Sequence, residues 1–183
     1  NYHSYAIETP ATSNGSVTVF MPDGANDVYS PIPGTNTFSP QARVFNKLIK
    51  IAANQYTLEF PDGTLWQLGA PQGATNVQQA LLSCILDTHS NAVTLLYDGQ
   101  PNPKLVAVVD APSYTSRSYY VDGKLSQITD PFGRSMSVTY SNGYVSTVTD
   151  MGGVQSVYSF YDSGTYRDRV KSLRTLDGEV TFT

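Results

Sequence analysis

The stretch that decides the fold is GKLSQITDPFGRSMSVTY, residues 123–140. It predicts two β-strands joined by a tight turn. Asp130 favours the start of a type I turn, Pro131 presets φ at the next position, and Gly133 closes the turn. The run that follows alternates polar and apolar residues up to Tyr140, which is typical of a half-buried strand. This stretch therefore predicts one β-hairpin.

The same pattern recurs along the second half of the chain. An apolar residue is followed by a second apolar residue three positions on, by Asp two further on, by Gly or Ser three further on, and by an aromatic residue seven further on. The copies are Leu82, Ile85, Asp87, Ser90, Tyr97; Leu105, Val108, Asp110, Ser113, Tyr120; Leu125, Ile128, Asp130, Gly133, Tyr140; Val145, Val148, Asp150, Gly153, Phe160; and Val170, Leu173, Thr175, Gly178. Fixed self-similarity at about 20 residues predicts a repeat architecture built from one supersecondary unit.

The spacing within each copy is constant, and only the segment after the aromatic residue varies in length from copy to copy. Such variation is typical of a surface loop between paired strands. The last copy stops before its aromatic position, so we expect an array that is cut within a unit. Asn142-Gly143 favours the positive φ angles of a tight hairpin turn, which connects one copy to the next.

The sequence therefore predicts an all-β fold in which antiparallel β-hairpin repeats form a curved, continuous, open sheet. The repeat region is expected at residues 76–183, with units at 82–104, 105–124, 125–144, 145–169 and 170–183. Residues 1–75 are expected to form a degenerate β-rich start, or cap, of the array. Within them, the proline-rich segment 30–40 is expected to form an edge or a loop. A short turn at 77–81 is the only helix expected.

The aromatic positions of the copies are expected to form a row on one face of the sheet. Strands lie about 4.8 Å apart, so equivalent residues of two-strand units would lie about 10 Å apart. A packing ladder between repeats is the first interpretation, because large aromatic residues bury well on pleated surfaces. The alternative is a ligand-stacking surface formed by Tyr97, Tyr120 and Tyr140, whose polar tips would face water or sugar.

These residues resemble the YD repeat of Rhs proteins. Residues 123–140 match its pattern G-x-L-x-x-I-x-D-x-x-G-x-x-x-x-x-x-Y, and Tyr97-Asp98-Gly99 and Tyr161-Asp162-Ser163-Gly164 are similar to its Tyr-Asp signature. The front half also resembles segments that precede such arrays, at residues 15–20, 45–48 and 56–64. The chain thus looks like bacterial Rhs proteins and the shell proteins of insecticidal toxin complexes, and more distantly like teneurin-like YD shells.

The resemblance implies an open section of a β-shell that encloses or presents a toxin or effector segment, without enzymatic activity of its own. It implies a bacterial protein that is secreted or held at the cell surface. The implied partners are further YD repeats of the parent chain and an enclosed toxin segment. Family shells also carry a self-cleaving aspartyl element with a D-P-x-G-L-type motif; residues 130–134 have Arg in place of Leu, so that activity is not transferred. The alternative function is a surface adhesion or carbohydrate-binding module whose tyrosine-rich face binds a glycan or a cell-surface receptor.

The composition argues against several other functions. A net charge of -4 and a pI near 4.9 disfavour nucleic acid as a partner. No run of 18 apolar residues is present, so no membrane span is expected. Cys84 is the single cysteine, which excludes an internal disulfide framework.

No catalytic, cofactor-binding or metal-binding residue is expected. Ser83, Cys84, Asp87 and His89 resemble a triad on paper, but neighbours in one hairpin rarely converge on one reacting atom. Most of the carboxylates stand at turn positions, which leaves a hydrolase based on Glu59 with an Asp partner as a weaker alternative. The loop residues Asp98, Asp122 and Asp162 have two possible roles, calcium binding and ordinary Asx turns.

Overall fold

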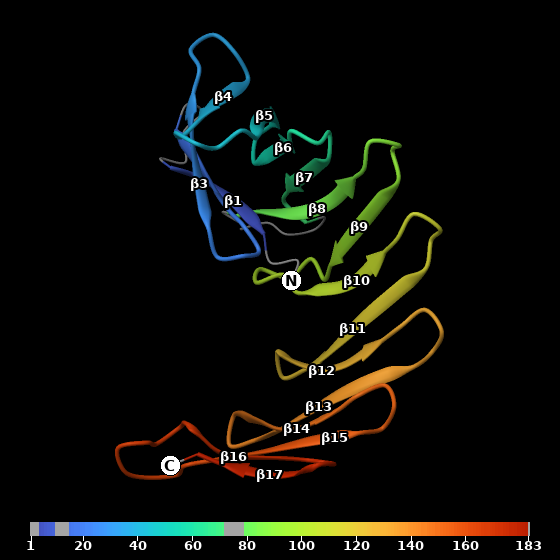
Figure 1. Cartoon of the computed structure of the whole chain (residues 1–183). Coiled ribbons are helices and arrows are strands. Elements are labelled where there is room, and N and C mark those ends of the chain that lie inside the picture. Colours follow the sequence, from blue (N-terminus) through green and yellow to red (C-terminus); the bar gives the residue numbers. More distant parts are fainter. Residues whose placement is uncertain (1–3, 10–14, 72–78, 183) are drawn as a thin grey trace. The chain divides into compact units, whose positions relative to one another are not determined.

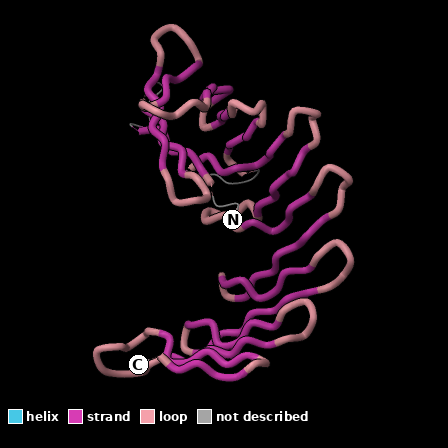
Figure 2. Tube along the Cα trace, viewed as in Figure 1, coloured by secondary structure: helices cyan, strands magenta, loops and turns pink. Residues whose placement is uncertain are grey.

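The computed structural model of the chain describes residues 4–9, 15–71 and 79–182, and every regular element in these ranges is a β-strand (Figures 1 and 2). The paired strands are antiparallel throughout, which confirms the predicted all-β antiparallel class. The chain divides into two compact units, residues 1–114 and 115–183. In the described part of the chain, no helix is long and apolar enough to cross a membrane.

Eight strands of the first unit form a closed ring. They are β1 (Tyr5–Thr9), β2 (Ser16–Phe20), β3 (Asn26–Pro31), β4 (Thr37–Pro40), β5 (Lys47–Ala52), β6 (Gln55–Glu59), β7 (Leu65–Gly69) and β8 (Ala80–Leu86). Each strand pairs with the next, and β1 pairs back with β8, with Tyr5 opposite Leu81 and Ala6 opposite Ala80. The expected open sheet is therefore wrong for this part of the chain, which is a closed barrel.

Side chains from all eight strands fill the barrel. The buried cluster consists of Ala6, Val17, Val19, Tyr29, Phe38, Leu48, Tyr56, Leu58, Leu68 and Ala80, each at most 5% exposed. Eight strands enclose an interior that side chains just fill. Apolar residues at alternate positions, Val17 and Val19 in β2 and Tyr56 and Leu58 in β6, predict these strands. The small residues that meet where β1 pairs with β8 belong to no such pattern.

Two local predictions for the front half also need correction. The segment expected as an edge or loop forms the β3–β4 hairpin, in which Ser30 lies opposite Ser39 and β4 also pairs with β5. Its prolines are tolerated because Pro31 and Pro40 end their strands. The helical turn expected at 77–81 lies partly outside the described residues, and Ala80 and Leu81 belong to β8.

Strand β8 connects the barrel to the first repeat. Its first residues pair with β1, while Cys84, Ile85 and Leu86 pair with β9 (Ala92–Tyr97), which in turn pairs with β10 (Leu105–Val109). The ladder with β7 shifts register at Ser83, between these two halves. A bulge bends its strand. The bend in β8 lies where this strand changes partner, which is also where the first copy of the repeat begins.

The second unit is a meander of seven strands: β11 (Thr115–Val121), β12 (Lys124–Thr129), β13 (Ser135–Ser141), β14 (Tyr144–Thr149), β15 (Gln155–Phe160), β16 (Val170–Thr175) and β17 (Gly178–Thr181). Each pairs with the next. Between residues 115 and 182 only Ser172 is buried. This unit is therefore a single-layer sheet without a buried apolar core.

The repeat contains a β-bulge that the sequence register did not lead us to expect. In the β13–β14 ladder, Val138 lies opposite Val148 and Tyr140 lies opposite Val145, which leaves Ser146 unpaired in the ladder. Equivalent register shifts occur before Tyr120 and Phe160. The bulge lets two apolar residues three positions apart face the same side, which a regular strand forbids. That odd spacing was the available signal.

Candidate functional site

The expected ligand-stacking tyrosines lie near the ends of their strands: Tyr97 is the last residue of β9, and Tyr120 and Tyr140 are the next-to-last residues of β11 and β13. Tyr97, Tyr120 and Tyr140 are half-buried, and each lies opposite the first apolar residue of the next copy. The Tyr97 hydroxyl donates to the Leu82 carbonyl at 2.8 Å, and the Tyr140 hydroxyl donates to the Leu125 carbonyl at 2.9 Å; both acceptors lie 15 residues earlier. Burial raises the pKa of Tyr97 to about 12. The polar tips of two of these tyrosines are thus used to hold neighbouring strands together.

Tyr97→Phe is expected to lower the free energy of unfolding of the first unit by about 1 kcal/mol, because it removes one hydrogen bond and leaves the Leu82 carbonyl without this donor. Urea denaturation followed by the fluorescence of Trp66, the single tryptophan, measures the change. Tyr119→Phe is the control, since Tyr119 is 45% exposed. Equal stability of both variants would show that the hydrogen bond from Tyr97 to the Leu82 carbonyl does not contribute to the free energy of unfolding.

The regularly spaced acids of the repeat serve turns. Asp130 Oδ1 accepts the N–H groups of Phe132 and Arg134, both at 2.9 Å, and the Gly133 N–H donates to the Asp130 carbonyl at 3.1 Å. Gly133 has φ of 82°, which an L-residue rarely adopts. The predicted turn at residues 130–133 is confirmed. Such turns fix the hairpin register of each copy.

The residues that resemble a triad are not brought together. Asp87 accepts the N–H groups of His89 and Asn91 at 2.8 Å and the Asn91 side-chain amide at 2.7 Å. Ser83 donates to the Gln67 carbonyl at 3.0 Å, and burial raises the pKa of Cys84. The carboxylate that would orient a histidine is thus committed to its own turn.

The turn at Asp87 predicts a pH effect on stability. Hydrogen bonds from Asn91 hold the pKa of Asp87 below its usual value. A depressed carboxyl pKa stabilises the fold above the unfolded value of about 3.9, and this contribution is lost as the pH falls through the lower folded value. Asp87→Asn keeps the Oδ1 acceptor but removes the titration, so its urea midpoint should fall less on acidification from neutral pH than that of the unmodified chain. An unchanged pH dependence would contradict this role.

A polar cluster lies within one end of the barrel. Lys50 Nζ donates to Glu8 Oε1 at 2.8 Å and Oε2 at 2.7 Å, and the Tyr56 hydroxyl donates to Glu8 Oε2 at 2.8 Å. Glu8 lies on β1, whereas Lys50 and Tyr56 lie on β5 and β6, which do not pair with β1. The contact therefore spans the barrel interior. Burial, and then the hydrogen bond to Glu8, raises the pKa of Tyr56.

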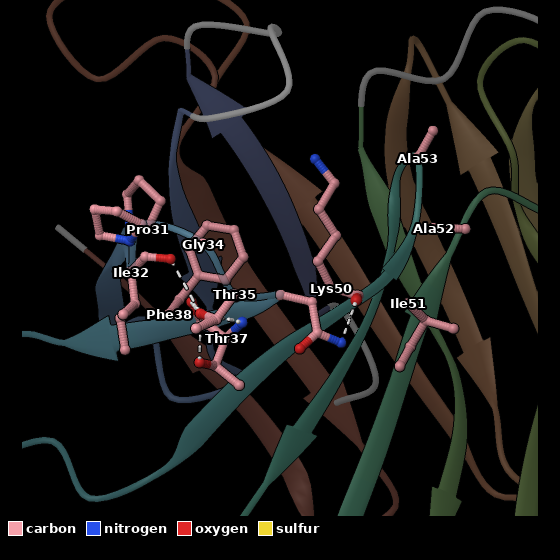
Figure 3. Close-up of a pocket in the computed structure, with 12 residues that line it drawn as sticks. Pro31, Ile32, Gly34, Thr35, Thr37, Phe38, Lys50, Ile51, Ala52 and Ala53 are labelled. Atoms are coloured by element: carbon pink, nitrogen blue, oxygen red, sulfur yellow. Dashed lines mark hydrogen bonds between the residues drawn. The ribbon is translucent and has the colours of Figure 1, made fainter.

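A cleft of about 570 Å³ adjoins this cluster. Its walls are the β3–β4 turn and the end of β5, and Figure 3 shows Lys50 and Ile51 on opposite sides of β5. The Lys50 N–H donates to the Asn36 carbonyl at 2.8 Å, and the Asn36 side chain donates to the Lys50 carbonyl at 3.3 Å. Because the Lys50 ammonium faces Glu8, the cleft offers apolar contacts and turn amides, which suit binding better than acid–base chemistry.

Asp98, one of the loop acids for which calcium binding was an alternative, accepts hydrogen bonds within its own turn. Asp98 Oδ1 accepts the N–H groups of Gln100 at 3.2 Å and Lys104 at 3.0 Å. Glu59 forms an exposed ion pair with Lys47 at 3.9 Å. Within residues 4–9, 15–71 and 79–182, no three His, Cys, Asp or Glu side chains form a group that could hold a metal ion.

Comparison with known proteins gives no assignment: no family model matches the chain, and no curated protein matches it.

Proposed function

We propose that this chain is a non-enzymatic structural section of an Rhs/YD-repeat shell that encloses or presents a toxin or effector segment. The observation that carries the proposal is the agreement between the sequence register and the hairpin geometry. Copies of the register share a bulge at the same position, and two of them share the hydrogen bond from tyrosine to a carbonyl 15 residues earlier. Side chains that recur to build the sheet are scaffold residues.

The two kinds of strand edge support a role as part of an array. β1 is paired on both sides, with β2 and β8, so the barrel offers no open ladder there. β17 pairs with β16, and all four of its residues are exposed. Further YD repeats of the parent chain are therefore the partners proposed for β17.

The single-layer sheet of the second unit supports an enclosed partner. A sheet face with apolar side chains is stabilised when another layer covers it. The half-buried residues Val138, Val148 and Tyr158 lie on such a face. A toxin segment packed against this face would supply the second layer. The parent molecule would be a bacterial protein that is secreted or displayed at the cell surface.

The alternative, an adhesion or carbohydrate-binding module that uses Tyr97, Tyr120 and Tyr140, is less well supported at these residues. Two of the three hydroxyls donate to backbone carbonyls, and all three rings are half-buried. A glycan or receptor bound at this row would compete with contacts that hold the strands together.

The intact mass of the natural polypeptide, followed by limited proteolysis, tests the proposal. A shell section predicts a product several times larger than 19.9 kDa, with a segment that is protected until the sheet unfolds. A natural product of about 19.9 kDa without a protected segment would contradict it.

A further inference from the structure

One position of the repeat carries a positive charge in three copies. The residue directly before the first apolar residue of a copy is Lys104 in the second copy, Lys124 in the third and Arg169 in the fifth. In the fourth copy this residue is Tyr144. The fourth copy therefore has no cation at a position that is basic in the copies on either side of it.

The third copy shows what such a cation contacts. Lys124 Nζ lies over the ring of Tyr140, 5.0 Å from its centroid, and donates a hydrogen bond to the Gly143 carbonyl at 3.0 Å. The negative face of an aromatic ring attracts an ammonium group at this distance. The repeat thus combines a primary ammonium, an aromatic ring and an oxygen acceptor at this position.

In the fourth copy a second aromatic ring stands in place of the lysine. The ring of Tyr144 stacks on that of Phe160, with centroids 4.9 Å apart and planes 29° apart. Phe160 has the place in the fourth copy that Tyr140 has in the third. Because Tyr144 is 36% exposed, part of this aromatic pair is open to solvent.

The two rings line a cleft of about 600 Å³ in the second unit, together with the β13–β14 turn and the loop at 161–169. This loop makes the step to the fifth copy longer than the two preceding steps. Its backbone is held by hydrogen bonds from the Tyr161 N–H to the Arg169 carbonyl at 3.0 Å and from the Asp168 N–H to the Tyr161 carbonyl at 2.9 Å. The cleft volume lies within the usual range of about 300–1,000 Å³ for small-molecule sites.

The loop places carboxylates beside the rings. Asp162 and Asp168 line the cleft, and so does Arg167. The Tyr144 hydroxyl is hydrogen-bonded to Asp168, which raises the pKa of Tyr144. Arg167 Nε lies 3.7 Å from Asp168 Oδ1, and the two side chains are 71% and 52% exposed. With two carboxylates and one guanidinium, the lining is negatively charged, and Asp162 is exposed.

Two further cations of this region lie over other rings. Arg169 Cζ is 5.7 Å from the ring centroid of Tyr166, and Lys171 Nζ is 6.0 Å from that of Tyr161. Neither cation is among the described residues that line the cleft. Contact between a cation and an aromatic ring is therefore a recurrent feature of this part of the sheet.

We propose that this cleft binds a linear polyamine, with its methylene chain against Tyr144 and its ammonium groups hydrogen-bonded to Asp162 and Asp168. A primary ammonium has three donors and no acceptor, so carboxylates suit it. Its alkyl chain packs on apolar surface while the charged ends stay among polar groups. Two carboxylates beside one aromatic surface favour a ligand with more than one ammonium group. This inference goes beyond the proposed scaffold function and does not depend on it.

Isothermal titration calorimetry of the chain with spermidine and with cadaverine tests the inference. Both amines should bind at low salt, and binding should weaken when sodium chloride is raised to about 0.5 M, because salt screens exposed charges. The matched ligand control is pentanediol, in which hydroxyls replace both amino groups of cadaverine, and it should not bind. A blocked Gly-Lys-Gly peptide tests whether a lysine side chain is the better ligand.

Three variants locate the ligand. Tyr144→Lys introduces the residue type found at this position in the third copy, so the chain should fold, and the new ammonium should lower the spermidine affinity at least about tenfold. Asp168→Asn, which removes a charge from the cleft, should weaken binding about tenfold. Asp177→Asn removes an exposed carboxylate in the β16–β17 turn, outside the cleft, and should bind as the unmodified chain does.

Four results would overturn the inference. The first is no binding of spermidine at concentrations up to about 10 mM, a range that detects even millimolar affinities. The second is binding of pentanediol as tight as that of cadaverine, which would show that charge is not recognised. The third is an equal loss of binding in the Asp168 and Asp177 variants, which would indicate a general charge effect. The fourth is tighter binding of the lysine peptide than of either amine, which would assign the cleft to a protein partner.

Discussion

Replacing Glu8 by alanine is expected to lower the free energy of unfolding of the first unit by about 3 kcal/mol. The change leaves the Lys50 ammonium, with a side chain only 20% exposed, without its carboxylate, and removes the acceptor of the Tyr56 hydroxyl. Removing one member of a mostly buried ion pair is costly because the remaining charge loses its compensation. Urea denaturation followed by Trp66 fluorescence reports on this unit, because Trp66 lies on β7 and packs against the barrel core.

The pair formed by Lys47 and Glu59 provides the matched control. Its charged groups are 3.9 Å apart and its side chains are 56% and 46% exposed, so Lys47→Ala should cost less than about 0.5 kcal/mol. The double variant Glu8→Leu/Lys50→Leu should recover most of the lost stability, because it removes both charges from the interior. A Glu8→Ala variant that is as stable as Lys47→Ala would show that the cluster does not hold the barrel.

Backbone amides of the barrel are expected to exchange with solvent at least about 100-fold more slowly than amides of β13, β14 and β15. The barrel contains fully buried residues such as Leu48 and Leu58, whereas the described residues of the second unit include no buried apolar side chain. Strands without a packed layer open at a lower free energy. Hydrogen exchange followed by mass spectrometry measures the difference, and each unit serves as the reference for the other. Equal protection in both units would contradict the single-layer description.

Local structure was largely predictable because it follows from turn chemistry and alternation. Asn142 and Gly143 have φ of 50° and 89°, as the predicted tight turn requires, and β13 and β14 pair across it. The bulge at Ser146 was also encoded, in the odd spacing of Val145 and Val148. The bulge was not predicted because the spacing of three recurs in every copy and so looks like a regular feature of the repeat. In a regular strand, however, residues three positions apart face opposite sides of the sheet.

Closure of the barrel and the polar cluster were not predictable in the same way. Ala6 and Ala80 are distant in the sequence, and the residues around them show no pattern that distinguishes them from other small residues in strands. Glu8, Lys50 and Tyr56 belong to no motif, and only the closed ring brings β1 opposite β5 and β6. The longer loop after Phe160 had one signal in the sequence, the longer step between the fourth and fifth copies, but the stacking of Tyr144 on Phe160 does not follow from the register.

Pairing of β1 with β8 distinguishes this molecule from the open sheet that its repeats predict, and a designed disulfide tests it directly. Ala6→Cys and Ala80→Cys, combined with Cys84→Ala, place two thiols at residues that face each other across the closure. Facing residues of an antiparallel pair have Cα atoms about 4.5–5.5 Å apart, within the range that a disulfide needs. After mild oxidation, mass spectrometry should show one intramolecular disulfide and no free thiol. Two thiols that both remain open to alkylation would mean that the barrel is not closed.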